Sequence, residues 1–509
     1  MSVLDSVPVI VGVGQVTEHL GDGFVGEMPE QLAALACEKA LEDVGAALRD
    51  DIDCLAYVRM FAHSVPEEFT PVIAPFGRSV SPPRSVIERL ALTDCEAIYS
   101  RAGGNEPQRL VAEFARAIQS GNLRAGLICG AEAIATIRHL QRTGETRDWS
   151  ETPSGETEDR GMGTEFAYEP EFNRHGAFAP VDIYPLLEQA HRGDLGHSRE
   201  AYRGLMSKVM SRLAQVAERN PLSMFHEPSG AEAIGAETPR NRIIGDPHLK
   251  SMVAKDGVNQ SAALVMTSFG VAQSLGIADR AIFLHGHGEA VEEACLSREK
   301  LGKTPAMAAA YQAALASAGI SVDQVSAFDL YSCFPIAVIA ALEVLGLDVD
   351  DKRPLTLTGG LPFFGGPGNN YSMHGIAEMV RFLRAQPDRS YGVVGANGGY
   401  LSKHAVGVYC NRPSEQMAFD SVAPSIKAGA PVSLNTAPEG RGVVESFTIR
   451  PKADGPRIIV VGRLVADQSR WVGLANTDHE ATLDWFLKED PIGGEVVVVP
   501  GAQNRVERA

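Results

Sequence analysis

One order of secondary-structure signals occurs twice in this chain, and that repetition constrains the fold more than any other feature. Residues 31–48 (QLAALACEKALEDVGAAL) have helical periodicity, reach a glycine stop, and lead through a short acidic turn into the strand-like residues 52–58. Residues 307–319 (MAAAYQAALASAG) and 325–330 show the same order. Two matching helix–turn–strand units predict an internally duplicated chain.

The repetition extends to glycine-rich loops. In the first half, the strand-like residues 95–100 run into Gly103-Gly104-Asn105, and a helix follows. In the second half, residues 355–358 are expected to be the matching strand, which leads into the loop 359–376 (GGLPFFGGPGNNYSMHGI) and another helix. Alternating strands and helices predict an α/β fold with mainly parallel sheets, whose functional loops follow the carboxyl ends of strands.

Two segments break this alternation. Residues 145–240 contain a long amphipathic helix at 199–219 followed by Asn-Pro, which indicates an inserted loop domain. The tail beyond about residue 430 favours a small β-rich domain, a partly open barrel, because it contains several strand-like runs and only one helical segment. Those strand-like runs are residues 443–449, 457–465 and 496–499, and the helical segment is 480–488.

Composition narrows the possible functions. The formal net charge is −18 and the acidic residues are spread along the chain, which argues against a nucleic-acid-binding surface. The N-terminus lacks the features of a signal peptide, and no apolar run reaches the ~20 residues of a membrane span. Seven scattered cysteines without a CxxC pair indicate a reduced, cytoplasmic setting, and no residue spacing predicts a metal site.

Several ordered segments resemble the thiolase superfamily over roughly residues 5–412. The opening strand VIVGVGQ, residues 117–136 (AIQSGNLRAGLICGAEAIAT), the helix followed by Asn-Pro at 209–225, and residues 241–268 each resemble a thiolase segment, in the thiolase order. The additional tail makes the chain most similar to the type 1 thiolase-like proteins, which carry an extra C-terminal domain.

This resemblance implies a duplicated thiolase fold with α-β-α-β-α layers. It divides the chain into an N-terminal half, an inserted loop domain, a C-terminal half, and a linker with a β-rich, OB-like domain. Their expected boundaries are residues 1–144 with 241–275, 145–240, 276–412 and 413–509.

The resemblance also implies a chemistry. Thiolases make or break a carbon–carbon bond next to a thioester, using a nucleophilic cysteine, a loop histidine, a second cysteine and an NEAF or HDCF motif. Counted against that pattern, the nucleophile falls at or beside Gly104, the loop histidine at Gly366 and the second cysteine at Ala396, while the motif reads Tyr331-Ser332-Cys333-Phe334. The usual cysteines and histidine are therefore expected to be missing.

Three residues are candidate replacements, each with an ordinary structural alternative. His374 either points into the pocket where the loop histidine of thiolases would lie, or is a half-exposed histidine at a helix start. Glu106 is either a base or a helix-stabilising acid in a first turn. Cys333 is either a relocated nucleophile or an inert buried thiol. The residues expected to form the pocket and its oxyanion donors are Gly104, Asn105, Tyr331, Gly366, Asn369, Asn397 and Gly398.

The sequence thus predicts a protein that binds coenzyme A or an acyl-CoA thioester as ligand, with no covalently bound cofactor and without ordinary thiolase activity. One alternative is an acyltransferase or β-ketoacyl-processing enzyme that uses His374 or Glu106. Another is a non-catalytic partner subunit of a lipid- or fatty-acid-metabolism complex, which binds another protein through its C-terminal domain. The acyl group, and the choice between monomer and homodimer, stay open.

Overall fold

A computed structural model describes residues 3–21, 23–45, 48–163, 169–226, 228–413 and 431–509. One ten-stranded sheet runs through the core in the order β10-β11-β12-β9-β1-β8-β4-β2-β3-β5. Its strands are β1 (Pro8–Thr17), β2 (Ile52–Tyr57), β3 (Glu96–Tyr99), β4 (Ala125–Ala133), β5 (Glu158–Asp159), β8 (Asn259–Ser268), β9 (Ile282–Val291), β10 (Val325–Asp329), β11 (Tyr391–Gly398) and β12 (Lys403–Cys410).

The predicted duplication is confirmed at the point where the two halves meet. β1 and β9 pair antiparallel, and each packs one helix against a Gly-x-Gly sequence: α1 (Pro29–Asp43) on β1 and α11 (Pro305–Ala318) on β9. At Gly12 and Gly14, and again at Gly286 and Gly288, a Cβ atom would collide with alanine carbonyl oxygens of the facing helix. The same close approach of helix to strand is therefore built twice.

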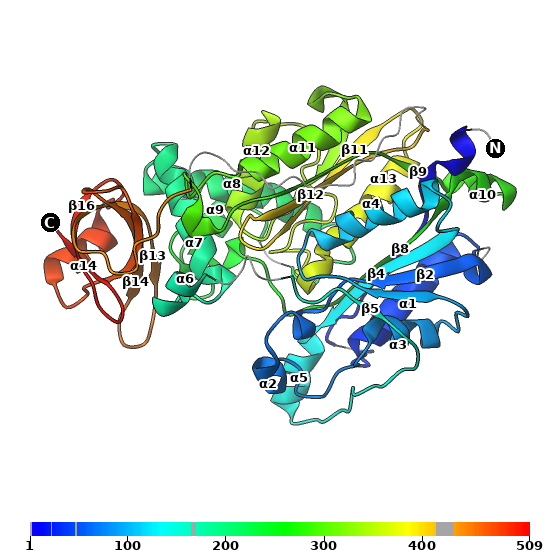
Figure 1. Cartoon of the computed structure of the whole chain (residues 1–509), viewed down its shortest axis with the longest axis horizontal. Helices are drawn as coiled ribbons and strands as arrows, with labels where there is room; N and C mark the ends of the chain where they lie inside the picture. Colours follow the sequence, from blue (N-terminus) through cyan, green and yellow to red (C-terminus); the bar gives the residue numbers. More distant parts are fainter. Residues whose placement is uncertain (1–2, 22, 46–47, 164–168, 227, 414–430) are drawn as a thin grey trace.

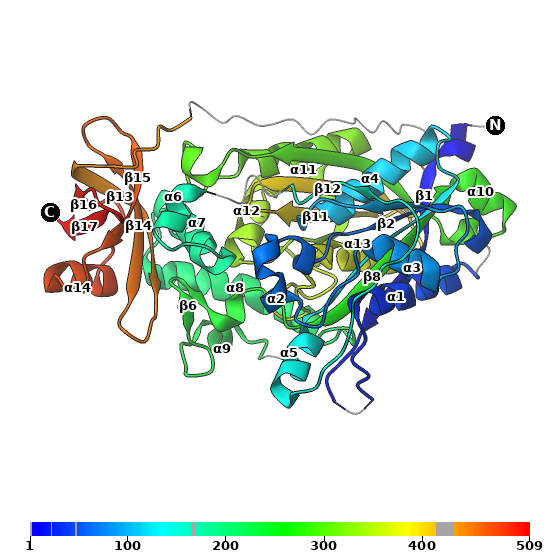
Figure 2. The ribbon, with the colours of Figure 1, turned by 60° about the horizontal axis from the view of Figure 1, so that its bottom comes forward.

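The helices complete five layers (Figure 2). α1 and α3 (Pro82–Arg89) cover the outer face of one half of the sheet, and α11 and α12 (Pro335–Leu345) cover that of the other. α4 (Glu106–Gln119) and α13 (Tyr371–Arg384) lie between the halves and contact strands of both. Both middle helices follow the glycine-rich loops, so their N-termini bring those loops to the interface of the halves. Short helices at the periphery are α2 (Thr70–Ile73), α5 (Ile134–Thr143) and α10 (Phe269–Ser274).

Residues 355–358 form no strand, and that prediction is wrong. The carboxylate of Asp329, at the end of β10, accepts hydrogen bonds from the backbone N–H groups of Leu357 (2.8 Å) and Thr358 (3.1 Å) and from the Thr356 hydroxyl (3.0 Å). The segment therefore wraps around one buried carboxylate instead of extending along the sheet.

Both edges of the large sheet are covered by the chain itself. β5 pairs with β3 at one edge, matching Ile98 with Glu158 and Tyr99 with Asp159. At the other edge, the N–H groups of Phe328 and Leu330 donate to the carbonyl oxygens of residues 354 and 355 at 2.9 and 3.0 Å. The edge strand that remains on the β3 side is only two residues long, and such short edge strands offer little backbone to a second molecule.

The tail forms a closed five-stranded barrel in the order β13-β14-β15-β17-β16, rather than the partly open one expected. Three strands and the helix α14 were predicted, whereas β15 and β17 were missed. In Figure 1 the barrel lies at the left, and helices of the 170–235 region separate it from the sheet. These elements are β13 (Gly440–Arg450), β14 (Arg457–Leu464), β15 (Arg470–Ala475), α14 (Glu480–Lys488), β16 (Glu495–Val499), β17 (Arg505–Arg508), α6 (Pro170–Arg174), α7 (Pro180–Asp194), α8 (Arg199–Ala217) and α9 (Ala231–Gly235), with a small hairpin of β6 (Ile243–Gly245) and β7 (His248–Leu249).

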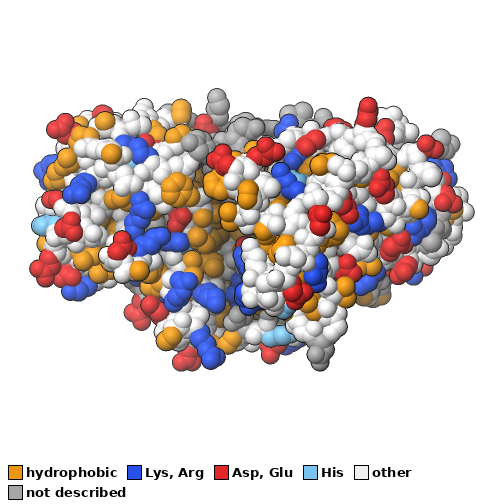
Figure 3. Space-filling view, turned by 90° about the horizontal axis from the view of Figure 1, so that it is seen from below, with side chains coloured by type: hydrophobic (Ala, Val, Ile, Leu, Met, Phe, Trp, Pro, Cys, Tyr) orange, Lys and Arg blue, Asp and Glu red, His pale blue; other side chains and the backbone are white. Residues whose placement is uncertain are grey.

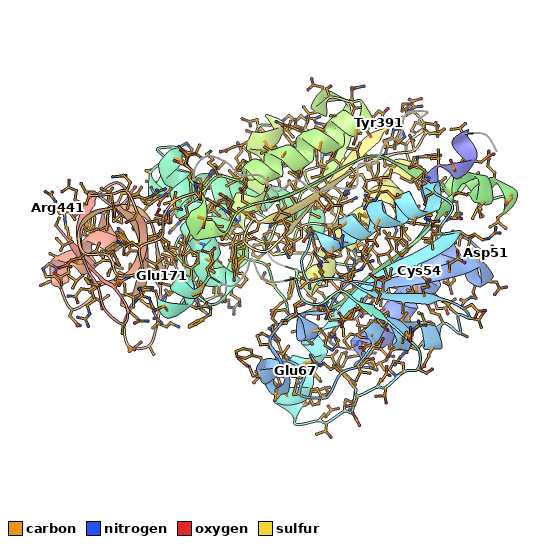
Figure 4. All side chains as sticks on the ribbon, viewed as in Figure 1. Asp51, Cys54, Glu67, Glu171, Tyr391 and Arg441 are labelled. Atoms are coloured by element: carbon orange, nitrogen blue, oxygen red, sulfur yellow. The ribbon has the colours of Figure 1, made fainter. Side chains whose placement is uncertain are left out.

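A buried arginine of the barrel links it to the core. The fully buried guanidinium of Arg470 pairs with Glu445 at 2.6 Å and donates to the carbonyl of Leu296 at 2.8 Å. Glu171, on α6, lies between barrel and core, whereas Arg441 lies on the barrel itself (Figure 4).

No helix among the described residues is both long and apolar enough to cross a membrane.

Candidate functional site

The two glycine-rich loops lie against each other at the N-termini of α4 and α13. The backbone N–H of Gly103 donates to Asn369 Oδ1 (3.0 Å), and the Ser372 hydroxyl donates to the carbonyl of Gly104 (2.7 Å). Asn369 Nδ2 also donates to the carbonyl of Arg59 (2.7 Å). Asn369 therefore has a positioning role in holding the loops together.

The side chain of Tyr331 occupies the space beside Gly104. A Cβ atom at position 104 would lie 2.7 Å from Tyr331 Cζ and 2.5 Å from the Asn397 carbonyl oxygen, and closer still to the Tyr331 hydroxyl oxygen. Tyr331 is half-buried, and desolvation raises the pKa of its phenol above the usual value. At neutral pH the phenol is therefore protonated and is a hydrogen-bond donor rather than a nucleophile.

In the part of the chain that the structure describes, the buried amide oxygens of Asn105 and Asn397 at the glycine-rich loops have no hydrogen-bond partner. Asn105 Oδ1 lies against Gly398, and its Nδ2 donates to Glu106 Oε1 at 3.3 Å. Asn397 Oδ1 is likewise unpartnered, while its Nδ2 donates to the Tyr184 hydroxyl at 3.1 Å. Because an unpaired buried acceptor costs about 1–3 kcal/mol, these two oxygens are suited to a ligand that brings N–H or O–H donors.

His374 is fully buried in the first turn of α13, so the half-exposed helix-end alternative is wrong. Its Nδ1 donates to Gln15 Oε1 at 2.6 Å, and its ring packs edge-on against Phe364. Desolvation lowers the pKa of His374 to about 3. The imidazole is neutral at physiological pH and is held by a residue of β1, between the two halves of the sheet.

Glu106 is buried and paired. Its Oε1 accepts a hydrogen bond from Arg109 Nε at 3.2 Å, one turn further along α4. Desolvation raises the pKa of Glu106, and Arg109 opposes that effect. The geometry favours the alternative in which Glu106 supports the helix start.

All seven cysteines are buried and unpaired. Cys54 lies on β2 in the N-terminal half (Figure 4). Cys333 is the cysteine that lies at the loops, 3.9 Å from Asn397 Nδ2, and burial raises the pKa of its thiol to about 12. The reactive form of cysteine is the thiolate, so Cys333 is held in its unreactive form.

Gly366 lies against the backbone of Lys255. Its N–H donates to the carbonyl of Lys255 at 2.8 Å, and a Cβ at position 366 would lie 3.2 Å from that oxygen. The ammonium group of Lys255 lies over the rings of Phe225 and Phe363, 5.1 and 5.7 Å from their centroids. A cation on an aromatic surface therefore borders the 359–376 loop.

Two residues near the loops were not among the site residues predicted from the sequence. Tyr184 on α7 stacks on Phe334 with ring centroids 4.2 Å apart, and its hydroxyl donates to the Gly399 carbonyl at 3.0 Å. Glu132, at the end of β4, accepts the N–H of Phe61 at 2.6 Å and lies against Gly368. Burial raises the pKa of Glu132 to about 8.

The surface has a hollow near the middle of one face. Figure 3 shows hydrophobic side chains in this hollow and lysine and arginine side chains gathered beside it.

Among the described residues, no group of three or more His, Cys, Asp or Glu side chains is arranged to hold a metal ion.

Comparisons with known proteins support one family. A family model described as the thiolase-like protein type 1 additional C-terminal domain matches residues 422–503. The crystal structure of a monomeric SCP2-thiolase-like protein type 1 from Mycobacterium smegmatis is 35% identical, with a TM-score of 0.81, over 99% of this chain and 100% of that one. No curated protein sequence matches the chain.

More distant solved structures share the fold. An Ltp2-ChsH2(DUF35) aldolase matches with a TM-score of 0.58 at 20% identity, over 79% of this chain and 98% of that one. An acetyl-CoA acetyltransferase from Syntrophomonas wolfei matches with a TM-score of 0.55 at 14% identity, over 80% of this chain and 99% of that one. The near-complete match to the mycobacterial structure, together with the C-terminal family model, shows that this chain belongs to the type 1 thiolase-like proteins.

Proposed function

We propose that this protein binds a coenzyme A thioester at the glycine-rich loops and does not carry out the cysteine-dependent thiolase reaction. The observation that carries the proposal is the position of the Tyr331 hydroxyl, which occupies the space of a side chain at residue 104. A phenol in this place supports binding of a carbonyl group and does not support formation of an acyl-enzyme.

The remaining candidates do not supply the missing chemistry. Covalent catalysis needs a nucleophile activated by a neighbouring base. The thiol of Cys333 is kept protonated by burial, and Glu106 is engaged with Arg109. His374 donates to Gln15 through Nδ1, and desolvation makes its unpartnered Nε2 a weak base by lowering the pKa of His374 to about 3. The geometry therefore favours binding over catalysis by His374 or Glu106.

The polar groups around Tyr331 match the parts of such a ligand. A thioester carbonyl would accept from the Tyr331 hydroxyl, and the two amide N–H groups of a pantetheine arm would donate to Asn105 Oδ1 and Asn397 Oδ1, which lack partners. Lys255, which borders the 359–376 loop, suits a phosphate of a CoA molecule.

Calorimetric titration with acetyl-CoA tests this proposal. We expect saturable binding to the full chain, and about tenfold weaker binding to Tyr331→Phe, since one hydrogen bond to the carbonyl is lost. Tyr391→Phe is the matched control, because Tyr391 lies on β11 and only accepts from Arg389 at 3.4 Å. The absence of heat at millimolar ligand, or equal weakening by both variants, would contradict the proposal.

A second candidate is a partner subunit that binds through the barrel. The side chains of Val465, Leu487, Val497 and Val499 on the barrel are exposed. The Ltp2-ChsH2(DUF35) structure is a complex with the same fold in one component. Under this candidate, Val497→Lys with Val499→Lys would abolish co-purification of a defined partner at constant stability, and unchanged co-purification would contradict it.

A further inference from the structure

A cavity is lined by residues of α7, α11, α12 and the segment that precedes α11, and has a volume of about 330 Å³. This volume is within the range of small-ligand pockets. Its walls combine apolar side chains, such as Ala308 and Val344, with a buried arginine, Arg298.

The guanidinium of Arg298 has an unused donor group. Arg298 is only 3% exposed, and its Nη2 donates to the Tyr400 carbonyl (2.8 Å) and the Ser402 hydroxyl (3.1 Å), while its Nε donates to the Glu293 carbonyl (3.1 Å). Its Nη1 is buried without an acceptor, and within the described residues no carboxylate forms an ion pair with Arg298. An unpaired buried cation with unused N–H groups is costly, and an anion in the cavity would relieve that cost.

Two carboxylates that line the cavity have direct partners other than Arg298. Glu292 accepts the N–H of Ala306, in the first turn of α11, at 2.9 Å. Glu343 lies 2.9 Å from His191 Nε2 and 3.1 Å from Lys303 Nζ. Glu293 and Glu299 also line the cavity, and the charge of Arg298 acts on Glu292 and Glu169 without a direct ion pair to either. Among the described residues, Arg298 Nη1 therefore lacks a direct acceptor.

We propose that this cavity binds a small oxyanion, the carboxylate or phosphate group of a small molecule, through Arg298 Nη1. Planar guanidinium groups favour such oxyanions because their N–H groups match pairs of oxygen atoms. The site is separate from the proposed thioester site and does not depend on it. Arg298 Nη2, however, donates to residues 400–402, which follow the end of β11 at Gly398. A ligand bound to Arg298 would therefore lie close to the segment that follows Asn397.

Titrations of the full chain with inorganic phosphate and with sodium acetate test the inference, with sodium chloride at equal ionic strength as the reference. We expect saturable binding of at least one of the two oxyanions, and the preferred one identifies the ligand group. Arg298→Gln should weaken that binding by about tenfold or more, because a charge-assisted hydrogen bond is lost. Lys488→Gln is the control: its ammonium is exposed on α14 of the barrel, outside the cavity lining, and pairs with Asp484 at 2.7 Å.

A cavity-filling variant protects the test against misfolding of Arg298→Gln. Ala308→Leu places a larger side chain in the cavity and so reduces its free volume, while every hydrogen bond of Arg298 stays in place. It should abolish the saturable binding while acetyl-CoA binding is retained. The inference would be overturned if neither oxyanion bound saturably to the wild-type chain, or if Ala308→Leu bound it as tightly as the wild type.

Discussion

The hydroxyl oxygen of Tyr331 lies within the volume that a Cβ atom would occupy at residue 104. This contact joins the C-terminal half of the fold to the glycine-rich loop of the N-terminal half. We therefore expect Gly104→Ala to destabilise the protein by about 1–3 kcal/mol through overpacking, as measured by chemical denaturation. Gly204→Ala on α8 is the control, because a Cβ there meets no atom within 4 Å. A Gly104→Ala variant as stable as the control would show that the Tyr331 ring moves aside freely.

His374 is expected to act on stability and not on ligand binding. Its ring is fully buried and donates to Gln15, so His374→Ala removes both packing and a hydrogen bond. The expected loss is about 2–4 kcal/mol in the free energy of unfolding. Acetyl-CoA affinity, measured at a temperature where the variant is folded, should stay within about twofold of the wild type. Full stability with abolished binding would place His374 in the site after all.

Glu132 should make stability depend on pH. Burial raises its pKa from 4.5 to about 8 in the folded protein, so the folded state binds more protons than the unfolded state between these values. The contribution of Glu132 to the free energy of unfolding is therefore complete below pH 4.5. It is lost as pH rises toward 8, which lowers the free energy of unfolding by roughly 3–5 kcal/mol.

Glu132→Gln is the variant that checks this pH dependence. Its amide oxygen can still accept the N–H of Phe61, but it does not titrate. Urea denaturation at pH 5 and pH 8 should find the variant more stable than the wild type at pH 8 and similar at pH 5. An unchanged difference between wild type and variant at the two pH values would exclude Glu132 as the source.

The covered sheet edges predict that the protein is monomeric. β5 covers Ile98 and Tyr99 of β3, and residues 354 and 355 cover β10, so the edge strand left on the β3 side is only two residues long. Light scattering after size-exclusion chromatography should give the single-chain mass of 54.3 kDa. A stable species of twice that mass would require an interface made by side chains.

The duplicated core was predictable because its signals are local. The helices at 31–48 and 307–319, each followed by a glycine stop, a short acidic turn and a strand, are read directly from residue spacing. Residues 355–358 misled the prediction because their backbone is held by Asp329, whose carboxylate lies 27 residues from Thr356 in sequence. β15 was missed because its short run carries little alternation of its own, and its place depends on pairing with β14 and β17.

The site was less predictable than the fold. Counting along the sequence placed Gly104 and Gly366 at the loops, but the contact between Gly104 and Tyr331 joins positions far apart in the chain. The helical periodicity of residues 371–384 did not predict the hydrogen bond between His374 and Gln15. Which strand residue faces a given side of this helix depends on how the two halves of the fold pack together. The orphaned acceptors of Asn105 and Asn397 are visible only when every hydrogen-bond partner is known.

The most direct measurement of the central claim is a calorimetric titration with acetyl-CoA, followed by recovery of the ligand and determination of the intact protein mass. The account predicts saturable binding, recovery of intact acetyl-CoA, and a protein mass without an added acetyl group. Release of free coenzyme A together with an acetylated protein would contradict it, as would the absence of any binding at millimolar ligand.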